Sequence, residues 1–165
     1  VAGAATGWTL SRVVGAALVA TAFKVARTDG LPGDWQGVVV YGGSATESAR
    51  LISASSSTGV AAGNEYMIEG EVQVLRSSLI NSLGIQGFVD GYSGARQMSA
   101  GIPAASGSYP HSDAAILGRK LVMRSPPGYR SGALTTTMRA ALHVGTRAGG
   151  YAVVLFGRQA LRRLT

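Results

Sequence analysis

Cysteine is absent from this chain of 165 residues, and charged side chains make up only 14% of it. The absence of cysteine excludes disulfide bridges, cysteine-ligated zinc and a thiol nucleophile. The low charge is about half the share of a typical globular domain, which favours a chain that covers much of its surface with other protein. Hydrophobic residues make up 46% of the chain, so it is not a disordered one.

Long apolar runs are also missing. Residues 13–23 carry no charge between Arg12 and Lys24, but a transmembrane helix needs about 20 apolar residues. The stretch fits a signal peptide loosely, with its basic start and alanine-rich centre. However, the apolar pattern continues past Lys24, and residues 19–26 alternate with a period of two, which favours a strand. We therefore expect no membrane partner.

Arginine supplies most of the positive charge, since 13 arginines and two lysines give a formal net charge of +7. Guanidinium groups form bidentate hydrogen bonds with phosphates and carboxylates, so arginine is suited to protein interfaces and to nucleic-acid binding. A genomic bias toward arginine, alanine and glycine codons explains the same composition. The densest group is Arg158, Arg162 and Arg163 near the end of the sequence. These residues are expected to contact phosphates without sequence preference, or else to lie in solvent or form interface ion pairs.

Strand patterns recur in pairs. In "EYMIEGEVQVL" (65–75), apolar residues alternate with Glu69, Glu71 and Gln73, which predicts a strand with one solvent-exposed face. Elsewhere, β-branched and aromatic runs end at glycine-rich turns such as "TRAGG" (146–150). The expected pairs are 12–27 with 36–42, 65–75 with 85–94, and 134–145 with 151–161.

Between the pairs, two short helices are expected. Residues 44–53 resemble a capped helix, with Ser44 as the cap and Glu47 three residues later. A second helix is expected near 112–118, inside the proline- and glycine-punctuated stretch 95–121. No linker divides the chain, so we predict a single domain over 1–165. Because strands do not alternate with regular helices, the expected fold is all-β, an antiparallel β-sandwich or barrel.

Three stretches resemble the shell domain of small icosahedral virus capsid proteins. They are "RVVGAALVATAFKVARTDGLPGDWQGVVVYGG" (12–43), "NEYMIEGEVQVLRSSLINSLGIQGFVDGYSG" (64–94) and "AALHVGTRAGGYAVVLFGRQAL" (140–161). The first two resemble its hairpins and the third its closing, strongly apolar strands. The resemblance implies a jelly-roll β-sandwich that assembles with copies of itself into a closed shell around nucleic acid.

Residues with catalytic chemistry are few. His143 lies within a strand pattern, where a structural role is expected. His111 stands beside Ser112 and Asp113, but sequence neighbours do not make a catalytic triad. The segment "GYSGA" (91–95) lacks the glycine spacing of a hydrolase nucleophile turn. We therefore expect no catalytic residues and no enzyme activity.

The acidic residues allow one metal hypothesis. Asp29 and Asp34 flank "GLPG" on one loop, and their oxygens could bind a hard cation such as Ca²⁺ at a subunit interface. The simpler interpretation is a turn in which Asp-Gly and Gly-Asp were selected for backbone geometry. Glu69 and Glu71 repel each other on one strand face, so we expect them to attract arginine from a neighbouring strand or subunit.

Together these observations favour a viral coat subunit located in the virion, with packaged nucleic acid and copies of itself as partners. The alternative is another viral or phage assembly protein, such as a tail-tube or head-completion subunit. Less favoured is an enzyme or ligand-binding module on a β-sandwich, which predicts convergent polar groups around His111 or around Glu69 and Glu71. A monomeric nucleic-acid-binding domain would instead show one continuous basic face.

Overall fold

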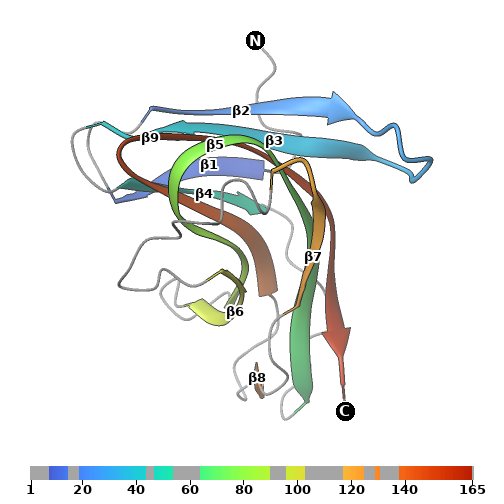
Figure 1. Ribbon diagram of the computed structural model, residues 1–165. Helices are drawn as coiled ribbons and strands as arrows, with labels where there is room; N and C mark the ends of the chain where they lie inside the picture. The colour runs from blue at the N-terminus through green and yellow to red at the C-terminus, as the bar shows by residue number, and fades with distance from the viewer. Residues whose placement is uncertain are drawn as a thin grey trace.

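The described part of the protein is all-β (Figure 1). The computed structural model describes residues 8–14, 19–43, 47–53, 64–89, 96–102, 117–124, 129–130 and 138–164. Its strands are β1 (Trp8–Val14), β2 (Val19–Ala26), β3 (Asp34–Tyr41), β4 (Glu47–Ser53), β5 (Glu65–Val89), β6 (Arg96–Ile102), β7 (Lys120–Arg124), β8 (Tyr129–Arg130) and β9 (Met138–Arg163). None of these residues forms a helix long and apolar enough to cross a membrane.

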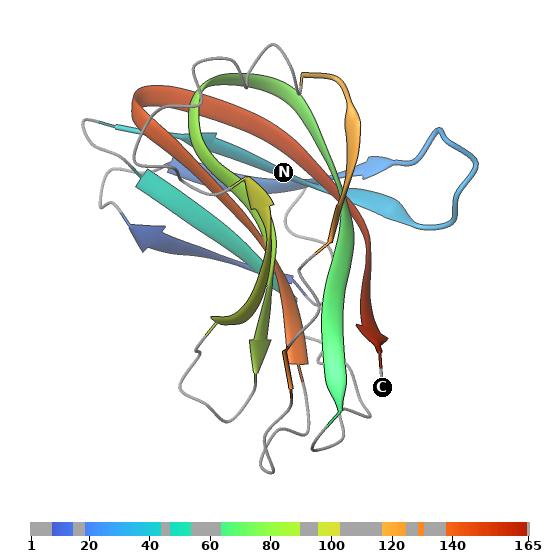
Figure 2. The same cartoon turned by 60° about the horizontal axis from the view of Figure 1, so that its bottom comes forward.

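Two long strands, β5 and β9, organise the fold. They pair with each other in antiparallel register from Tyr66 opposite Arg163 to Val89 opposite Met138. The register shifts around Ile80, and Leu79 adopts a left-handed backbone conformation with φ of 57°. Such irregularities bend strands. Figure 2 shows the two strands curving together, so that each continues from one sheet into another.

Each half of this bent pair is the centre of its own sheet. The first sheet has the order β2–β3–β9–β5–β7 and uses residues 65–78 of β5 and 151–163 of β9. The second has the order β1–β4–β9–β5–β6 and uses residues 80–89 and 138–146 of the same strands. The strand pairing is antiparallel in both sheets, and β8 pairs with the beginning of β5. The fold is an antiparallel β-sandwich of jelly-roll type, as the sequence predicts.

The core lies between the two sheets, where side chains from both form one apolar cluster. A methyl group built on Gly70 in the first sheet would lie 3.2 Å from Cγ2 of Ile85 in the second sheet, so the halves of β5 pack directly against each other. The cluster consists of Ala22, Val38, Val40, Tyr66, Ile68, Val72, Val74, Ile80, Leu83, Ile85, Met123, Val144, Ala152, Val154 and Phe156. In the strands that supply several residues to this cluster, alternate residues therefore point away from the core, as pleated strands require.

Several sequence predictions hold. Strands β2 and β3 form the antiparallel pair expected within residues 12–42. Along the first half of β5, Ile68, Val72 and Val74 are buried, while Glu69 and Glu71 remain half-exposed on the opposite face. The period-two pattern therefore identified the core face of this strand correctly.

Other predictions are wrong. Residues 47–53 of the expected helix form strand β4, because β1 and β9 satisfy the backbone on both sides. The expected strand 12–27 contains the end of β1 and all of β2, while 65–75 and 85–89 belong to the one strand β5. "TRAGG" (146–150) is likewise a bend within β9. Of the helix expected near 112–118, residues 112–116 lie outside the described part, and Leu117 forms an isolated bridge with Val74.

Candidate functional site

The outer face of the first sheet carries the candidate site. Directly opposed residues on neighbouring strands share a face, so the strand register places the side chains in rows that cross β3, β9 and β5. The three rows are Tyr41–Tyr151–Ser78, Val39–Val153–Arg76 and Gly37–Leu155–Gln73. Beyond the third row lie Trp35, Gly157 and Glu71, which are mutual neighbours. The face therefore has an aromatic end, defined by Tyr41 and Tyr151, and a charged end, defined by Arg27, Trp35 and Glu71.

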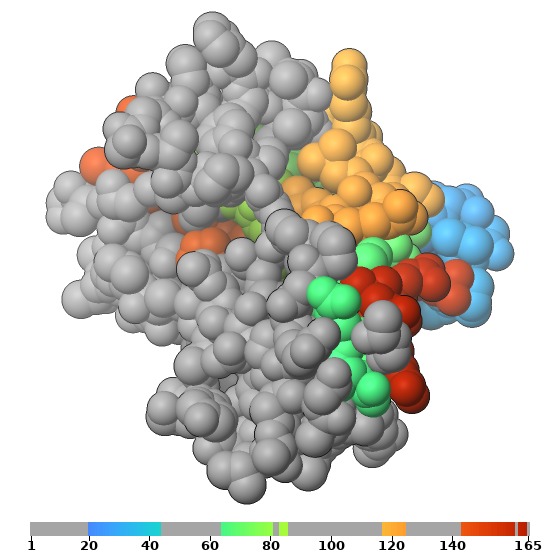
Figure 3. Space-filling model, turned by 90° about the horizontal axis from the view of Figure 1, so that it is seen from below, coloured from blue at the N-terminus to red at the C-terminus, as the bar shows by residue number. Residues whose placement is uncertain are grey.

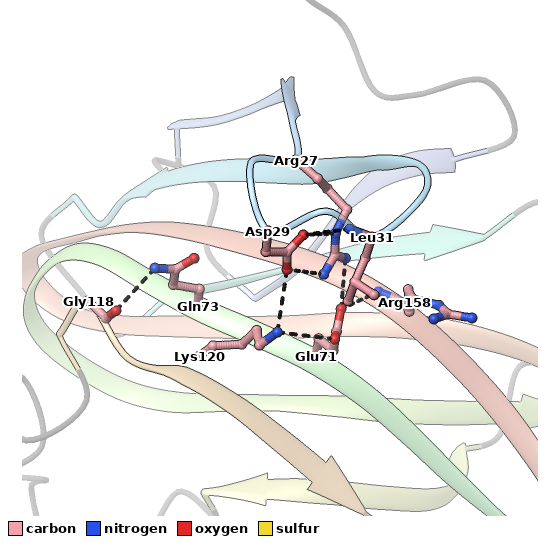
Figure 4. Close-up of polar contacts among 8 residues, drawn as sticks. All are labelled: Arg27, Asp29, Leu31, Glu71, Gln73, Gly118, Lys120 and Arg158. Atoms are coloured by element: carbon pink, nitrogen blue, oxygen red, sulfur yellow. Dashed lines mark hydrogen bonds and ion pairs between the residues drawn. The ribbon is translucent and has the colours of Figure 1, made fainter.

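At the charged end, Arg27 connects the loop after β2 to strand β5 (Figure 4). Its side chain is only 1% exposed. Nε and Nη2 donate to the two oxygens of Asp29 at 2.9 and 2.6 Å, and Nη1 donates to Oε2 of Glu71 at 2.7 Å. Lys120 Nζ lies 3.4 Å from Asp29 Oδ2 and 3.7 Å from Glu71 Oε1. Asp29 and Glu71 thus share two cations, Arg27 from the same loop as Asp29 and Lys120 from β7.

The aromatic ring and the backbone complete this cluster. Cζ of Arg27 lies 4.2 Å from the centroid of the Trp35 ring, a cation–π contact. The backbone amide of Arg158 donates to Oε2 of Glu71 at 3.2 Å. The absence of a side chain at Gly157 makes room for these groups, because a Cβ there would lie 2.6 Å from both Glu71 Oε2 and Trp35 Cζ3. The charged end is therefore closed and internally satisfied.

The ion pairs shift the pKa values of this cluster. Hydrogen bonds from Arg27 hold the pKa of Asp29 well below its usual range. Burial acts to raise the pKa of Glu71, but the hydrogen bonds from Arg27 and from the Arg158 amide outweigh it, so the pKa is lowered. Hydrogen bonding to Asp29 and then Glu71 raises the pKa of Arg27 in return. Both carboxylates are ionised at neutral pH, which does not suit a general acid.

Glu69 forms a second ion-pair group at the same end. Its oxygens accept hydrogen bonds from Nε of Arg124 on β7 at 2.6 Å and from Nη2 of Arg162 on β9 at 2.7 Å. Hydrogen bonds from Arg162 and then Arg124 lower the pKa of Glu69. Seen from below, β7 and the ends of β5 and β9 lie together on the surface (Figure 3). The prediction that arginine from neighbouring strands pairs with these carboxylates is confirmed for Glu69, whereas Glu71 pairs with Arg27 from the loop after β2.

The aromatic end differs in being open. Tyr41 on β3 and Tyr151 on β9 oppose each other directly, and they are 53% and 40% exposed. Val39 is also exposed and lies in the next row, opposite Val153. Two neighbouring tyrosines on a sheet present an apolar surface with hydroxyl groups at its edge. Such a surface can bind a ligand that has both apolar faces and hydroxyl groups.

The residues predicted for metal binding face cations. Asp29 forms ion pairs with Arg27 and Lys120. It also accepts a hydrogen bond from the backbone amide of Leu31 at 3.4 Å, as aspartates in turns do. Asp34 lies 3.1 Å from Nζ of Lys24. Across the described ranges, no group of three or more histidine, cysteine, aspartate or glutamate side chains lies together. Calcium binding by Asp29 and Asp34 stays a prediction.

The three C-terminal arginines do not act as one set. All three residues are exposed, and Arg162 also forms an ion pair with Glu69. Their contact with nucleic-acid phosphates stays a prediction that the geometry of Arg162 does not favour. His143 is half-buried in β9, with Arg50 and Gly84 opposite it on the neighbouring strands. The hypothesis on His111 lies outside the described residues.

Sequence reasoning missed the groups that define both ends of the face. Arg27 was part of a polar loop, and its partner Glu71 lies far along the chain. Tyr41 and Tyr151 were treated as dispersed aromatics, because their pairing depends on the register of β3 with β9. The available signal was that each tyrosine stands at the end of a β-branched run, "VVVY" and "YAVV".

Comparison with known proteins gives a fold but no family. No family model matches the sequence, and no curated sequence is significantly similar to it. Among solved structures, a carbohydrate-binding module of the β-sandwich superfamily superposes with a TM-score of 0.65 at 11% identity, over 99% of this chain and 59% of that one. The family 11 carbohydrate-binding module of the Clostridium thermocellum cellulase Lic26A-Cel5E gives 0.51 at 8% identity, over 97% and 89%.

A phage protein contains the same fold. The enzymatically active domain of bacteriophage CBA120 tailspike protein 4 superposes with a TM-score of 0.57 at 11% identity, over 96% of this chain and 20% of that one. The chain thus spans 59% of the first similar structure and a fifth of this one. At these identities the similarity establishes the jelly-roll sandwich.

The expectation of a viral coat subunit is wrong. The similar structures include carbohydrate-binding modules rather than capsid proteins, so the expected partners, copies of the chain in a shell and packaged nucleic acid, are contradicted as well. Proteins with many unrelated functions share the jelly-roll sandwich. The strand pattern therefore predicted the fold correctly but not the function. The ligand-binding module, which the sequence ranked lower, is better supported. Location in the virion stays an untested prediction.

Proposed function

We propose that this chain is a non-catalytic carbohydrate-binding module that binds a glycan on the aromatic end of the first sheet's outer face. The observation that carries the proposal is the exposed pair formed by Tyr41 and Tyr151. Sugar rings have faces rich in C–H groups and edges rich in hydroxyls, so they stack on aromatic rings while hydrogen-bonding at the rim. The fold shared with carbohydrate-binding modules supports the same function.

Polar groups around the two rings suit this task. Ser78 opposes Tyr151 on β5, and Arg76 and Thr21 lie in the adjoining row. Their side chains can donate to or accept from sugar hydroxyls at the edge of the rings. The rings are held by strands within a packed sandwich, which keeps the surface rigid and lowers the entropic cost of binding.

A non-catalytic role agrees with the charges of the same face. Glu69 and Glu71 are the carboxylates that an enzyme on this face would use, but both are tied to arginines and have lowered pKa values. A glycoside hydrolase needs one carboxyl group that stays protonated to act as an acid. These two carboxylates are suited to holding strands and the loop after β2 in place.

The test is depletion of purified protein from solution by a panel of immobilised polysaccharides, at 0.15 M salt. We expect Tyr41→Ala and Tyr151→Ala each to weaken binding about tenfold through the loss of one stacking surface. The control is Val122→Ala, which trims another exposed apolar side chain on β7, away from the aromatic end. Equal binding by all four proteins, or binding to no polysaccharide, would overturn the proposal.

A further inference from the structure

The charges around the aromatic end are unbalanced. At the charged end, Asp29, Glu69 and Glu71 all have cations as partners, and Asp34 pairs with Lys24. Arg76, by contrast, is exposed and contacts no carboxylate within the described part of the chain. The whole sequence has a net charge of +7, so its field also favours anions.

Arg76 is placed to act together with the tyrosines. It opposes Val153 on β9, so it lies on the outer face one row from Tyr151. Tyr151 and Arg76 are thus diagonal neighbours on adjacent strands, at a Cα separation of about 7–8 Å that long side chains span. A ligand stacked on the tyrosine ring would have one edge within reach of the guanidinium group.

We infer that the glycan bound on this face is anionic, with its sugar ring on Tyr41 and Tyr151 and a carboxylate or sulfate group on Arg76. The inference rests on the proposed carbohydrate binding. A guanidinium group donates two parallel hydrogen bonds to either anion, and such charge-assisted bonds are stronger than those to a neutral hydroxyl. A neutral glycan would cover Arg76 and remove water from its charge without supplying a counter-charge.

The test uses two pairs of polymers that share a backbone and differ in charge. Polygalacturonate against its methyl ester tests a carboxylate, and dextran sulfate against dextran tests a sulfate. We expect the native chain to bind the anionic member of at least one pair about tenfold more tightly, and Arg76→Gln to remove that preference. Circular dichroism of the variant checks that it folds, as expected for an exposed residue.

Arg158→Gln is the matched control. It also removes one positive charge, but from the charged end, and it keeps the backbone amide that donates a hydrogen bond to Glu71. Arg158 lies five residues beyond Val153 on β9, about 16 Å at about 3.3 Å per residue. That separation exceeds the Debye length of about 8 Å at 0.15 M salt. We therefore expect Arg158→Gln to change the affinity for the anionic polymer less than about twofold.

The outcomes separate the inference from the proposed function. If neutral and anionic members bind alike, or neither binds, the glycan is not anionic. The proposed function still stands in that case if Tyr41→Ala weakens binding to another polysaccharide about tenfold. If poly-glutamate binds as tightly as the anionic glycan and Tyr41→Ala has no effect, charge alone causes the binding, and both ideas are wrong.

Discussion

The aromatic end and the charged end of the first sheet's outer face are built on the same strands, β3, β9 and β5. At the charged end, Trp35 is 6% exposed and lies under a guanidinium group that two carboxylates hold. At the aromatic end, Tyr41 and Tyr151 stand exposed side by side. Groups that satisfy one another stabilise the fold, whereas a contiguous exposed apolar surface marks a binding site. The difference therefore separates a stabilising region from the region that we propose binds a ligand.

The largest effect is expected from Arg27→Met, which would break the charged end. Asp29 and Glu71 would then lie close together without their shared guanidinium group. We expect the free energy of unfolding to fall by about 2–3 kcal/mol, because the charged hydrogen bonds from Arg27 are lost and Lys120 is the one cation left beside both carboxylates among the described residues. Urea denaturation followed by circular dichroism measures it.

The control for this variant is Lys24→Met, which removes an exposed ion pair with Asp34 on the same hairpin. Exposed pairs contribute about 0–1 kcal/mol, so this change should be close to neutral. Similar losses for Arg27→Met and Lys24→Met would mean that the charged end is no more than a solvated surface.

A smaller loss is expected from Gly157→Ala. Its new methyl group would press on Glu71, which an ion pair with Arg27 holds, and on Trp35, which lies against the Arg27 guanidinium group. Overpacking of this kind costs about 1–3 kcal/mol. Gly37→Ala is the comparison nearer the aromatic end, where the Phe23 ring fills the space and no ion pair holds it. We expect Gly157→Ala to unfold at a lower urea concentration than Gly37→Ala. A lower midpoint for Gly37→Ala would show that the ion pairs do not make the charged end rigid.

The charged end should also make stability depend on pH. The pKa values of Asp29, Glu69 and Glu71 are lowered by folding from ordinary values of 3.8 for aspartate and 4.5 for glutamate. The unfolded chain therefore binds more protons in this range, so stability rises with pH. The contribution is complete above the ordinary values and is lost as pH falls through the lower, folded ones.

Thermal unfolding between pH 2 and 7 measures this dependence. The midpoint should be level above about pH 5 and fall below it. Glu71→Gln should make the fall shallower, because one of the carboxyl groups that protonation would neutralise is gone. An unchanged slope in this variant would mean that Glu71 gains no stability from its ionised form.

The sequence allowed the sandwich, the core face of β5 and the attraction of Glu69 and Glu71 for arginine to be predicted. These follow from local alternation and from charge. It did not reveal that β5 and β9 each run through both sheets. Polar residues such as those of "RSSLINSLG" (76–84) indicate a turn locally, and whether they bend or reverse a strand depends on its neighbours.

The candidate site was hidden for a related reason. Tyr41 and Tyr151 meet through the register of two strands that are distant in sequence, and Arg76 joins them through a third. Register is set by non-local pairing and by bulges, and an error of one residue moves every side chain to the other face. Residue types alone therefore indicated neither the aromatic pair nor its neighbouring charge.

The smallest effect on stability is expected from Tyr41→Ser and Tyr151→Ser. A cross-strand aromatic pair contributes about 0.2–1 kcal/mol, and exposed rings add little to the core. Urea denaturation should therefore give free energies of unfolding within about 1 kcal/mol of the native chain, while each variant binds the glycan about tenfold more weakly. A loss above about 2 kcal/mol would place the rings among the stabilising groups. Both ends of the face would then stabilise the fold, and the exposure of the tyrosines would no longer indicate a ligand-binding site.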